Sequence, residues 1–504
     1  MDRKTRIYVI FPSSGLDHRG AWEAADMKQK VMTNEGMLKE LGDRCEGVEF
    51  VGRVNLIDEE RKDRISRARY GITEAERQYQ AETYRISGER TQAVLEDIRR
   101  SSENLDGILI FGAPWEELIE TGLPIIAVFP MWGTWMANFN FDDYKGKSIL
   151  IGYLPVVRDV SESVFSSRLD DIAGKIKLVQ VLSKMKGLRA LVVTDQPVLG
   201  RYEPTDLQVS GDRKGYEETY LRHLKETFGT ELVAIPQQEM VERMNKADGE
   251  EAKKVARRWI EEAEGMKGAN EAEVVKSAKL YLAMKELMER YRCQAITTEG
   301  YGVFEEYSGG PIPSQGLPSS QFYTDGVVAT SETLIDSLIT QQLGLPLTGS
   351  PGFNGDYLID PFNGVAIIGH CECPFNPWGD DRRAPYVIRN LPRWEKNEGG
   401  ACVQVNLPIG ETVTVAKISM VDKKISLFTG EAVSGRELFE AWDDLACRTK
   451  LAIKTDTAEL LEHLDWKTFG VHRVVFYGNF REKMKDLATL IGFEVVEKDR
   501  RQSL

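Results

Sequence analysis

The chain has 504 residues, which is too long for a single hydrophobic core, so two to four domains are expected. Apolar residues make up 42% and charged residues 29%, the balance of a soluble globular protein. The net charge of −14 argues against a nucleic-acid partner, because phosphate binding needs a concentrated positive stripe. No segment resembles a transmembrane helix or a cleaved signal, and the six cysteines lack paired spacing. We therefore expect a cytoplasmic protein with no membrane partner and no disulfide framework.

Residues 1–165 are predicted to form a first α/β domain. Helical segments separate its five apolar runs, which are residues 6–11, 48–54, 108–111, 125–129 and 149–151. This alternation favours a parallel, doubly wound (Rossmann-like) sheet. The loop that follows the fourth run contains Trp132 and is rich in aromatic and amide groups. It is either a packed connection or a loop that contacts a sugar or another subunit.

Two further domains are expected, over residues 166–350 and 351–504. The first has apolar runs at 188–193, 231–235 and 294–297, separated by helices, and is predicted to be a second Rossmann-like domain. The second alternates apolar and polar residues with a period of two over 403–407, 412–418 and 424–428. This pattern indicates antiparallel strands, and helices are expected at 456–464 and 479–491. The last domain is therefore predicted to be a β-barrel-like domain with helices.

The richest stretch chemically is residues 325–374. An apolar run at 327–329 leads to Glu332, which is expected to open an amphipathic helix with Asp336 one turn later on the same face. A second apolar run at 365–368 leads to His370, and Asp356 lies between the two runs. Ligands bind where the strands of α/β sheets end. Two carboxylates and an imidazole form a mixed oxygen and nitrogen ligand set that suits a divalent metal.

Four elements of the chain resemble the L-arabinose isomerase and L-fucose isomerase superfamily. They are Glu332, then Asp356-Tyr357, then Gly369-His370 with Cys371 and Pro374 close behind, and the segment 470–476 that contains His472. The resemblance is strongest over 327–374 and 472–494, and in the first half it is limited to the alternation of strands and helices. Enzymes of this superfamily bind one manganese-type ion and interconvert an aldose and a ketose through an enediol.

The resemblance implies that Glu332, Asp356, His370 and His472 hold a divalent ion, most readily Mn²⁺, and that the two carboxylates are also catalytic. The spacing from Asp356 to His370 is shorter than in arabinose isomerases, so Asp360 is an alternative ligand. The implied substrate is a pentose, a 6-deoxyhexose or a related sugar.

The resemblance also implies a homo-oligomer, trimeric or hexameric, with the active site near a subunit interface. In these enzymes the first domain of one subunit covers the active site of another. Trp132 and His18 are therefore candidate sugar contacts, together with Glu299, which follows a strand of the second domain.

Other kinds of site and function were weighed. The segment His370-Cys371-Glu372-Cys373 invites a zinc site, but no second cysteine pair exists, and Glu372 could instead orient His370. Two phosphate-binding motifs are incomplete, because Phe141 and Glu305 stand where glycines are required, so no nucleotide cofactor is expected. A metal-dependent sugar-acid aldolase or lyase, and a sugar-binding protein without catalysis, remain alternatives to the isomerase.

Overall fold

The computed structural model describes residues 3–12, 34–58, 60–61, 64, 73–130, 144–154, 162–195, 213–299, 313–391, 400–435, 438 and 446–501. Within it the chain forms two compact units, residues 1–183 with 482–493 and residues 184–481 with 494–504. No helix in the described ranges has both the length and the apolar character needed to cross a membrane. The predicted division into three domains stays a prediction.

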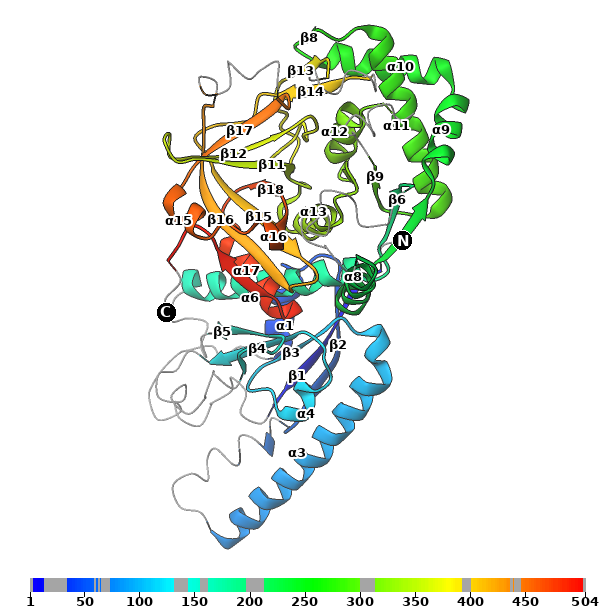
Figure 1. Ribbon diagram of the computed structural model, residues 1–504. Coiled ribbons are helices and arrows are strands. Elements are labelled where there is room, and N and C mark those ends of the chain that lie inside the picture. Colours follow the sequence, from blue (N-terminus) through cyan, green and yellow to red (C-terminus); the bar gives the residue numbers. More distant parts are fainter. Residues whose placement is uncertain are drawn as a thin grey trace. The chain divides into compact units, whose positions relative to one another are not determined.

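The first unit is built on a five-stranded parallel sheet in the order β2-β1-β3-β4-β5 (Figure 1). Its strands are Thr5–Phe11, Val48–Asn55, Gly107–Ile110, Ile125–Pro130 and Ile149–Leu154, in sequence order. The expected strands of this segment and their parallel pairing are therefore confirmed. The long helix α3 (Glu74–Ser101) begins with a capping box at Thr73 and Glu76 and packs Val94, Leu95 and Ile98 against the sheet.

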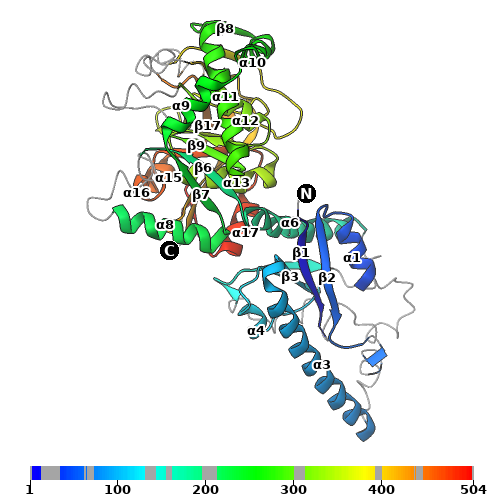
Figure 2. The ribbon, with the colours of Figure 1, turned by 90° about the vertical axis from the view of Figure 1, so that its right-hand side faces the viewer.

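The second unit contains a four-stranded parallel sheet in the order β10-β9-β6-β7. Its strands are β6 (Arg189–Val193), β7 (Glu231–Ile235), β9 (Ala295–Thr298) and β10 (Val328–Thr330). Helices α9 (Gln237–Lys246), α10 (Gly249–Glu262) and α11 (Glu271–Tyr291) gather beside this sheet (Figure 2). The fully buried Trp259 of α10 donates a hydrogen bond to Gln321, which fixes α12 (Gly316–Thr324) against these helices.

A closed, six-stranded antiparallel barrel follows in the chain. Strands β15 (Thr412–Ser419), β18 (His472–Tyr477), β11 (Phe353–Asp360), β12 (Val365–His370), β17 (Thr449–Lys454) and β16 (Lys424–Val433) pair in that order, and β16 returns to β15. The expected antiparallel barrel is confirmed. Strand β19 (Glu494–Glu497) also pairs with β16, in parallel.

A short strand, β8 (Gly265–Lys267), lies between α10 and α11 and pairs with β13 (Tyr386–Arg389). Two details of the predicted elements are wrong. The predicted strand at 403–407, observed as β14 (Cys402–Val405), pairs with β13 in a separate three-stranded sheet and is not in the barrel. The helix after β10 begins at Ile335 and not at Glu332, because the intervening backbone turns to the left-handed region.

Helix α13 (Ile335–Thr348) joins the parallel sheet to the barrel. It contacts β9 and β10 of the sheet and β15 and β18 of the barrel (Figure 1). Gly344 sits where the helix meets β18, and a methyl group at this position would overlap the ring of Phe476. The absence of a side chain therefore permits the close packing of α13 on β18, the strand that begins with His472.

The Gly344→Ala variant is expected to lose stability because the helix or the Phe476 ring must move. Overpacking of this kind costs about 1–3 kcal/mol. Urea unfolding followed by circular dichroism measures the change. Gly88→Ala in α3 is the matched control, because nothing lies within 4 Å of its added methyl group. The control is expected to be neutral or to gain up to about 1 kcal/mol from helix propensity. Equal effects in the two variants would refute the close approach at Gly344.

Candidate metal centre

Glu332 lies in a strained turn between β10 and α13. Glu332 and Thr333 have φ angles of 62° and 52°, in the left-handed region that non-glycine residues rarely adopt. Such strain costs about 1–2 kcal/mol per residue and persists only where the surroundings enforce it. Here the amide of Thr333 donates to the carbonyl of Thr298, and the amide of Leu334 donates to the carbonyl of Ser331. The turn thereby fixes the position of the Glu332 carboxylate, just after strand β10 of the parallel sheet.

The other three predicted ligands come from the barrel. Strand β11 lies between β12 and β18, and Asp356 is opposite Gly369 on one side and His472 on the other. His370 is the last residue of β12. Asp356 therefore lies within a barrel strand. The antiparallel register brings it next to His472, with Asp356 Oδ1 3.5 Å from His472 Nε2.

Glu332, His370 and His472 converge on one point. The ligand atoms they offer all lie within 4.8 Å of one another. His370 Nε2 is 3.7 Å from Glu332 Oε1, and His472 Nε2 is 3.8 Å from Glu332 Oε2. Bonds of about 2.1 Å to a common ion would place neighbouring ligand atoms about 3–4 Å apart. This group can therefore bind a metal ion.

The charges at this centre also suit a cation. Burial raises the pKa of Glu332 to about 8, and the nearby carboxylates of Asp356 and Glu372 add to the rise while His370 opposes it. Burial lowers the pKa of His472 well below its ordinary value, and the positive charges of His370 and Lys417 act in the same direction. His472 is thus held neutral with a nitrogen able to ligate, and a bound cation would stabilise the negative charge of an ionised Glu332.

His370 has a different electrostatic environment from His472. Burial by itself would lower the pKa of His370, but Glu372, Glu332 and Asp356 together raise it above its ordinary value. Burial also raises the pKa of Asp356. Half of the Asp356 side chain is accessible, however, so solvent weakens that effect, whereas only 11% of the Glu332 side chain is exposed. Asp356 therefore occupies the margin of the centre, open to a ligand.

Glu372 lies near the ring nitrogen of His370 that faces away from Glu332. Its buried carboxylate accepts a 2.8 Å hydrogen bond from the hydroxyl of Tyr323 and a longer one from the amide of Ser331. Glu372 Oε1 lies 4.0 Å from His370 Nδ1, on the opposite side of the ring from Glu332. A carboxylate behind a ligating histidine orients the ring and raises its basicity.

The Glu372→Gln variant is expected to bind Mn²⁺ about 10–100-fold more weakly, because the amide removes the charge behind His370 while it can still accept from Tyr323. Isothermal titration calorimetry with Mn²⁺ measures the change. Glu411→Gln is the matched control, since that carboxylate accepts hydrogen bonds from Trp378 and lies outside the Glu332, His370 and His472 group. Unchanged affinity in Glu372→Gln would rule out a role for Glu372 in orienting His370.

The remaining candidates from the sequence are placed as follows. Asp360 is partly exposed at the β11–β12 turn and accepts hydrogen bonds from Phe362 and Asn363, so Asp356 and not Asp360 lies beside the histidines. Asp336 is buried and accepts a hydrogen bond from Tyr220. The Glu299 carboxylate accepts hydrogen bonds that tie together the ends of β6, β9 and α9, from Thr194, Asp195 and Gln237. His18 and Trp132 lie outside the described residues.

Two side chains near this centre were missed by sequence reasoning. Lys417 is 1% exposed, donates a hydrogen bond to Ser337 Oγ at 2.6 Å and contributes positive charge at His472. Lys417 could have been selected from the sequence, because it is the single lysine in the alternating segment 412–418. The Cys447 thiol lies 3.9 Å from Asp356 Oδ2, and no sequence signal indicated this contact.

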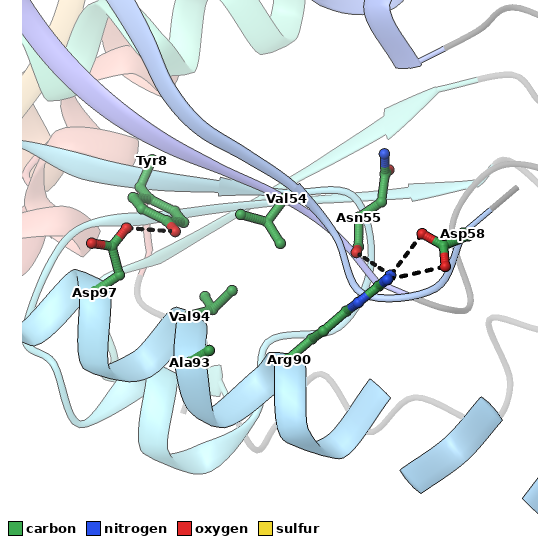
Figure 3. A pocket seen from close by; sticks show the side chains of 8 residues that line it. All are labelled: Tyr8, Val54, Asn55, Asp58, Arg90, Ala93, Val94 and Asp97. Carbon is green, nitrogen blue, oxygen red and sulfur yellow. Dashed lines mark hydrogen bonds and ion pairs between the residues drawn. The ribbon is translucent and has the colours of Figure 1, made fainter. Parts of the chain in front are cut away.

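A hollow of about 460 Å³ lies in the first unit between α3 and strands β1 and β2 (Figure 3). Tyr8 donates a hydrogen bond to Asp97 at one end, and Arg90 pairs with Asp58 at the other. The charged side chains of Asp58, Arg90 and Asp97 thus each have a hydrogen-bond partner among the residues that line the hollow, and they include no group of metal ligands. We therefore place the candidate functional site in the second unit.

Comparison with known proteins gives no identification: no family model matches the chain, and no curated protein matches it significantly. The class that the fold and the site define is therefore a mixed α/β protein with two parallel sheets, a closed antiparallel barrel and a candidate metal centre of Glu332, His370 and His472.

Proposed function

We propose that this chain is a metal-dependent aldose–ketose isomerase that acts on a pentose, a 6-deoxyhexose or a related sugar. The observation that carries the proposal is the convergence of Glu332, His370 and His472 within 4.8 Å, with Asp356 next to His472. These four side chains are the ones that the resemblance to the L-arabinose and L-fucose isomerases implies. Their mixture of carboxylate oxygens and imidazole nitrogens suits Mn²⁺.

The proposed reaction moves one proton between two neighbouring carbons of the sugar. One carboxylate takes the proton from C2 of the aldose, giving an enediol, and a proton is then delivered to C1 to give the ketose. The hydroxyl proton on O2 is transferred to O1 in the same process. Glu332 and Asp356 are proposed for these roles, because they are the two carboxylates that adjoin the histidines from different elements.

The surroundings suit this chemistry. A bound divalent ion would stabilise the negative charge that develops on the sugar oxygens. With the ion bound, Glu332 would be ionised, which is the state that a base needs to accept the C2 proton. Asp356 has an accessible side chain and can meet a sugar that approaches from solvent. We further propose a homo-oligomeric, cytoplasmic enzyme in which His18 and Trp132 contact sugar bound by a neighbour.

The proposal is tested by metal analysis of the purified protein and a screen of pentoses, hexoses and 6-deoxy sugars with and without Mn²⁺. We expect one divalent ion per chain and a ketose product that keeps every carbon of the aldose, seen by ¹³C nuclear magnetic resonance. Release of two fragments would instead identify a lyase. Sugar binding that survives chelators, without turnover, would identify a binding protein.

A further inference from the structure

Three cysteines from separate parts of the chain pack together beside the metal centre. Cys371 follows β12, Cys402 begins β14, and Cys447 precedes β17. Cys371 and Cys402 are buried against Leu391, and Cys447 packs against them while remaining partly exposed. These three residues form a thiol cluster, defined here as Cys371, Cys402 and Cys447.

The backbone fixes this cluster. The amide of Val403 donates to the carbonyl of Cys371, which ties the start of β14 to the end of β12. Strand β12 pairs with β17 up to His370, opposite Thr449, which brings the segment of Cys447 alongside. At Gly316 of α12, a side chain would meet the carbonyl of Cys371 and the Cβ of Cys402, so the glycine permits close packing over both. The cluster is thus part of the folded core at this junction.

The cluster also adjoins the metal centre on two sides. Cys371 is bonded directly to His370, and the Cys447 thiol lies 3.9 Å from Asp356 Oδ2. A bond between the two sulfurs would draw Cys447 away from Asp356 and tether it next to His370. Because metal centres depend on the exact orientation of their ligands, such a bond would weaken metal binding.

We propose that Cys371 and Cys447 form a reversible disulfide when the protein meets a small-molecule disulfide, and that this disulfide disables the metal centre. The partly exposed Cys447 attacks the small disulfide R–S–S–R as its thiolate and releases one RSH. Cys371 then attacks the Cys447 sulfur of the mixed disulfide and releases the second RSH. Two protein thiols are oxidised and one small disulfide is reduced to two thiols.

Cys402 is the less favourable partner because its thiol donates to the carbonyl of Asn390 at 3.3 Å. Cys45, Cys293 and Cys373 are buried and lie outside the thiol cluster. This inference rests on the metal centre of the proposed function and does not require that the substrate be a sugar.

The test uses the full-length protein incubated with oxidised glutathione, followed by peptide mapping and Mn²⁺ titration calorimetry. We expect a Cys371–Cys447 disulfide, a loss of Mn²⁺ affinity of about tenfold or more, and recovery of both after treatment with dithiothreitol. Cys447→Ser and Cys447→Ala are expected to prevent both the disulfide and the loss of affinity. Cys293→Ser, which changes a buried cysteine outside the cluster, is the matched control and is expected to respond like the natural protein.

Three results would overturn the inference. They are absence of the Cys371–Cys447 disulfide, formation of that disulfide with Mn²⁺ affinity unchanged, and equal loss of affinity in Cys447→Ser. Failure of the proposed function looks different: the disulfide and its effect on Mn²⁺ would be observed, but no sugar would be isomerised.

Discussion

The Glu332→Gln variant is expected to lose isomerase turnover by at least about 10²–10⁴-fold, the usual contribution of a positioned acid or base. It is also expected to bind Mn²⁺ much more weakly, because the amide replaces the only carboxylate within 4 Å of both His370 and His472 among the described residues. The fold should be retained. With a pKa of about 8, the metal-free Glu332 is mostly neutral at pH 7, so a neutral amide of the same shape fits its surroundings.

Turnover with saturating sugar, Mn²⁺ titration and urea unfolding together measure this result. Glu239→Gln is a suitable control, because its mostly buried carboxylate accepts hydrogen bonds from Tyr291 on a distant helix pair. The control should keep its turnover and its affinity for Mn²⁺. If Glu332→Gln retained more than about a tenth of the natural activity, Glu332 could not have the catalytic role assigned to it.

Binding of Mn²⁺ is expected to release about one proton at pH 7 from Glu332, because its pKa of about 8 leaves this carboxyl mostly protonated before the ion arrives. The raised pKa of His370 acts in the same direction, since any proton on that ring must also leave. Affinity should therefore rise with pH, by up to about tenfold per unit below pH 8, and level off above it.

The same shift has a consequence for stability. The pKa of Glu332 is raised in the folded state, so its contribution to the free energy of unfolding of the metal-free protein is fully present when the pH is below the ordinary pKa of a glutamate. That contribution is lost as the pH rises through about 8.

Calorimetry in two buffers of different ionisation enthalpy measures the protons that are released when Mn²⁺ binds. In Glu332→Gln, the protons that Glu332 releases in the natural protein should be missing from the measured total. Proton release near zero in the natural protein at pH 7 would contradict the electrostatic description of the site.

Most strands of the two parallel sheets could be predicted because they contain a short, almost wholly apolar run, such as residues 108–110 and 190–193. Such runs are typical of strands buried on both faces. Strand β8 could not be predicted in this way, because Gly265–Lys267 is exposed and lies between two helices. It forms only because β13, more than a hundred residues later, pairs with it.

The barrel was predicted from β15 and β16, whose side chains alternate, but the membership of β11 was not. The sequence Phe353–Asp360 contains Gly355 and two aspartates, residues that are rare in strands, and its partners β12 and β18 stabilise it. The position of Asp356 next to His472 is a property of this register and therefore of contacts distant in sequence. Local residue patterns do not contain that information.

Residue type and position near apolar runs, together with the resemblance to the isomerase superfamily, selected Glu332, His370 and His472, which the structure brings together. The turn at Glu332 was missed because the sequence Ser331-Glu332-Thr333 resembles an ordinary helix start, and neither Glu nor Thr indicates a left-handed backbone. The thiol cluster was missed for another reason. Its three cysteines have no regular spacing, and only the junction of β12, β14 and β17 brings them together.

The central claim is that Glu332, His370 and His472 hold one divalent ion. Anomalous diffraction from crystals of the protein soaked in Mn²⁺ tests it most directly. We predict one strong manganese peak within bonding distance of the Glu332 carboxylate and of Nε2 of both histidines. A folded protein that shows manganese only elsewhere, or shows none at saturating concentration, would contradict the claim.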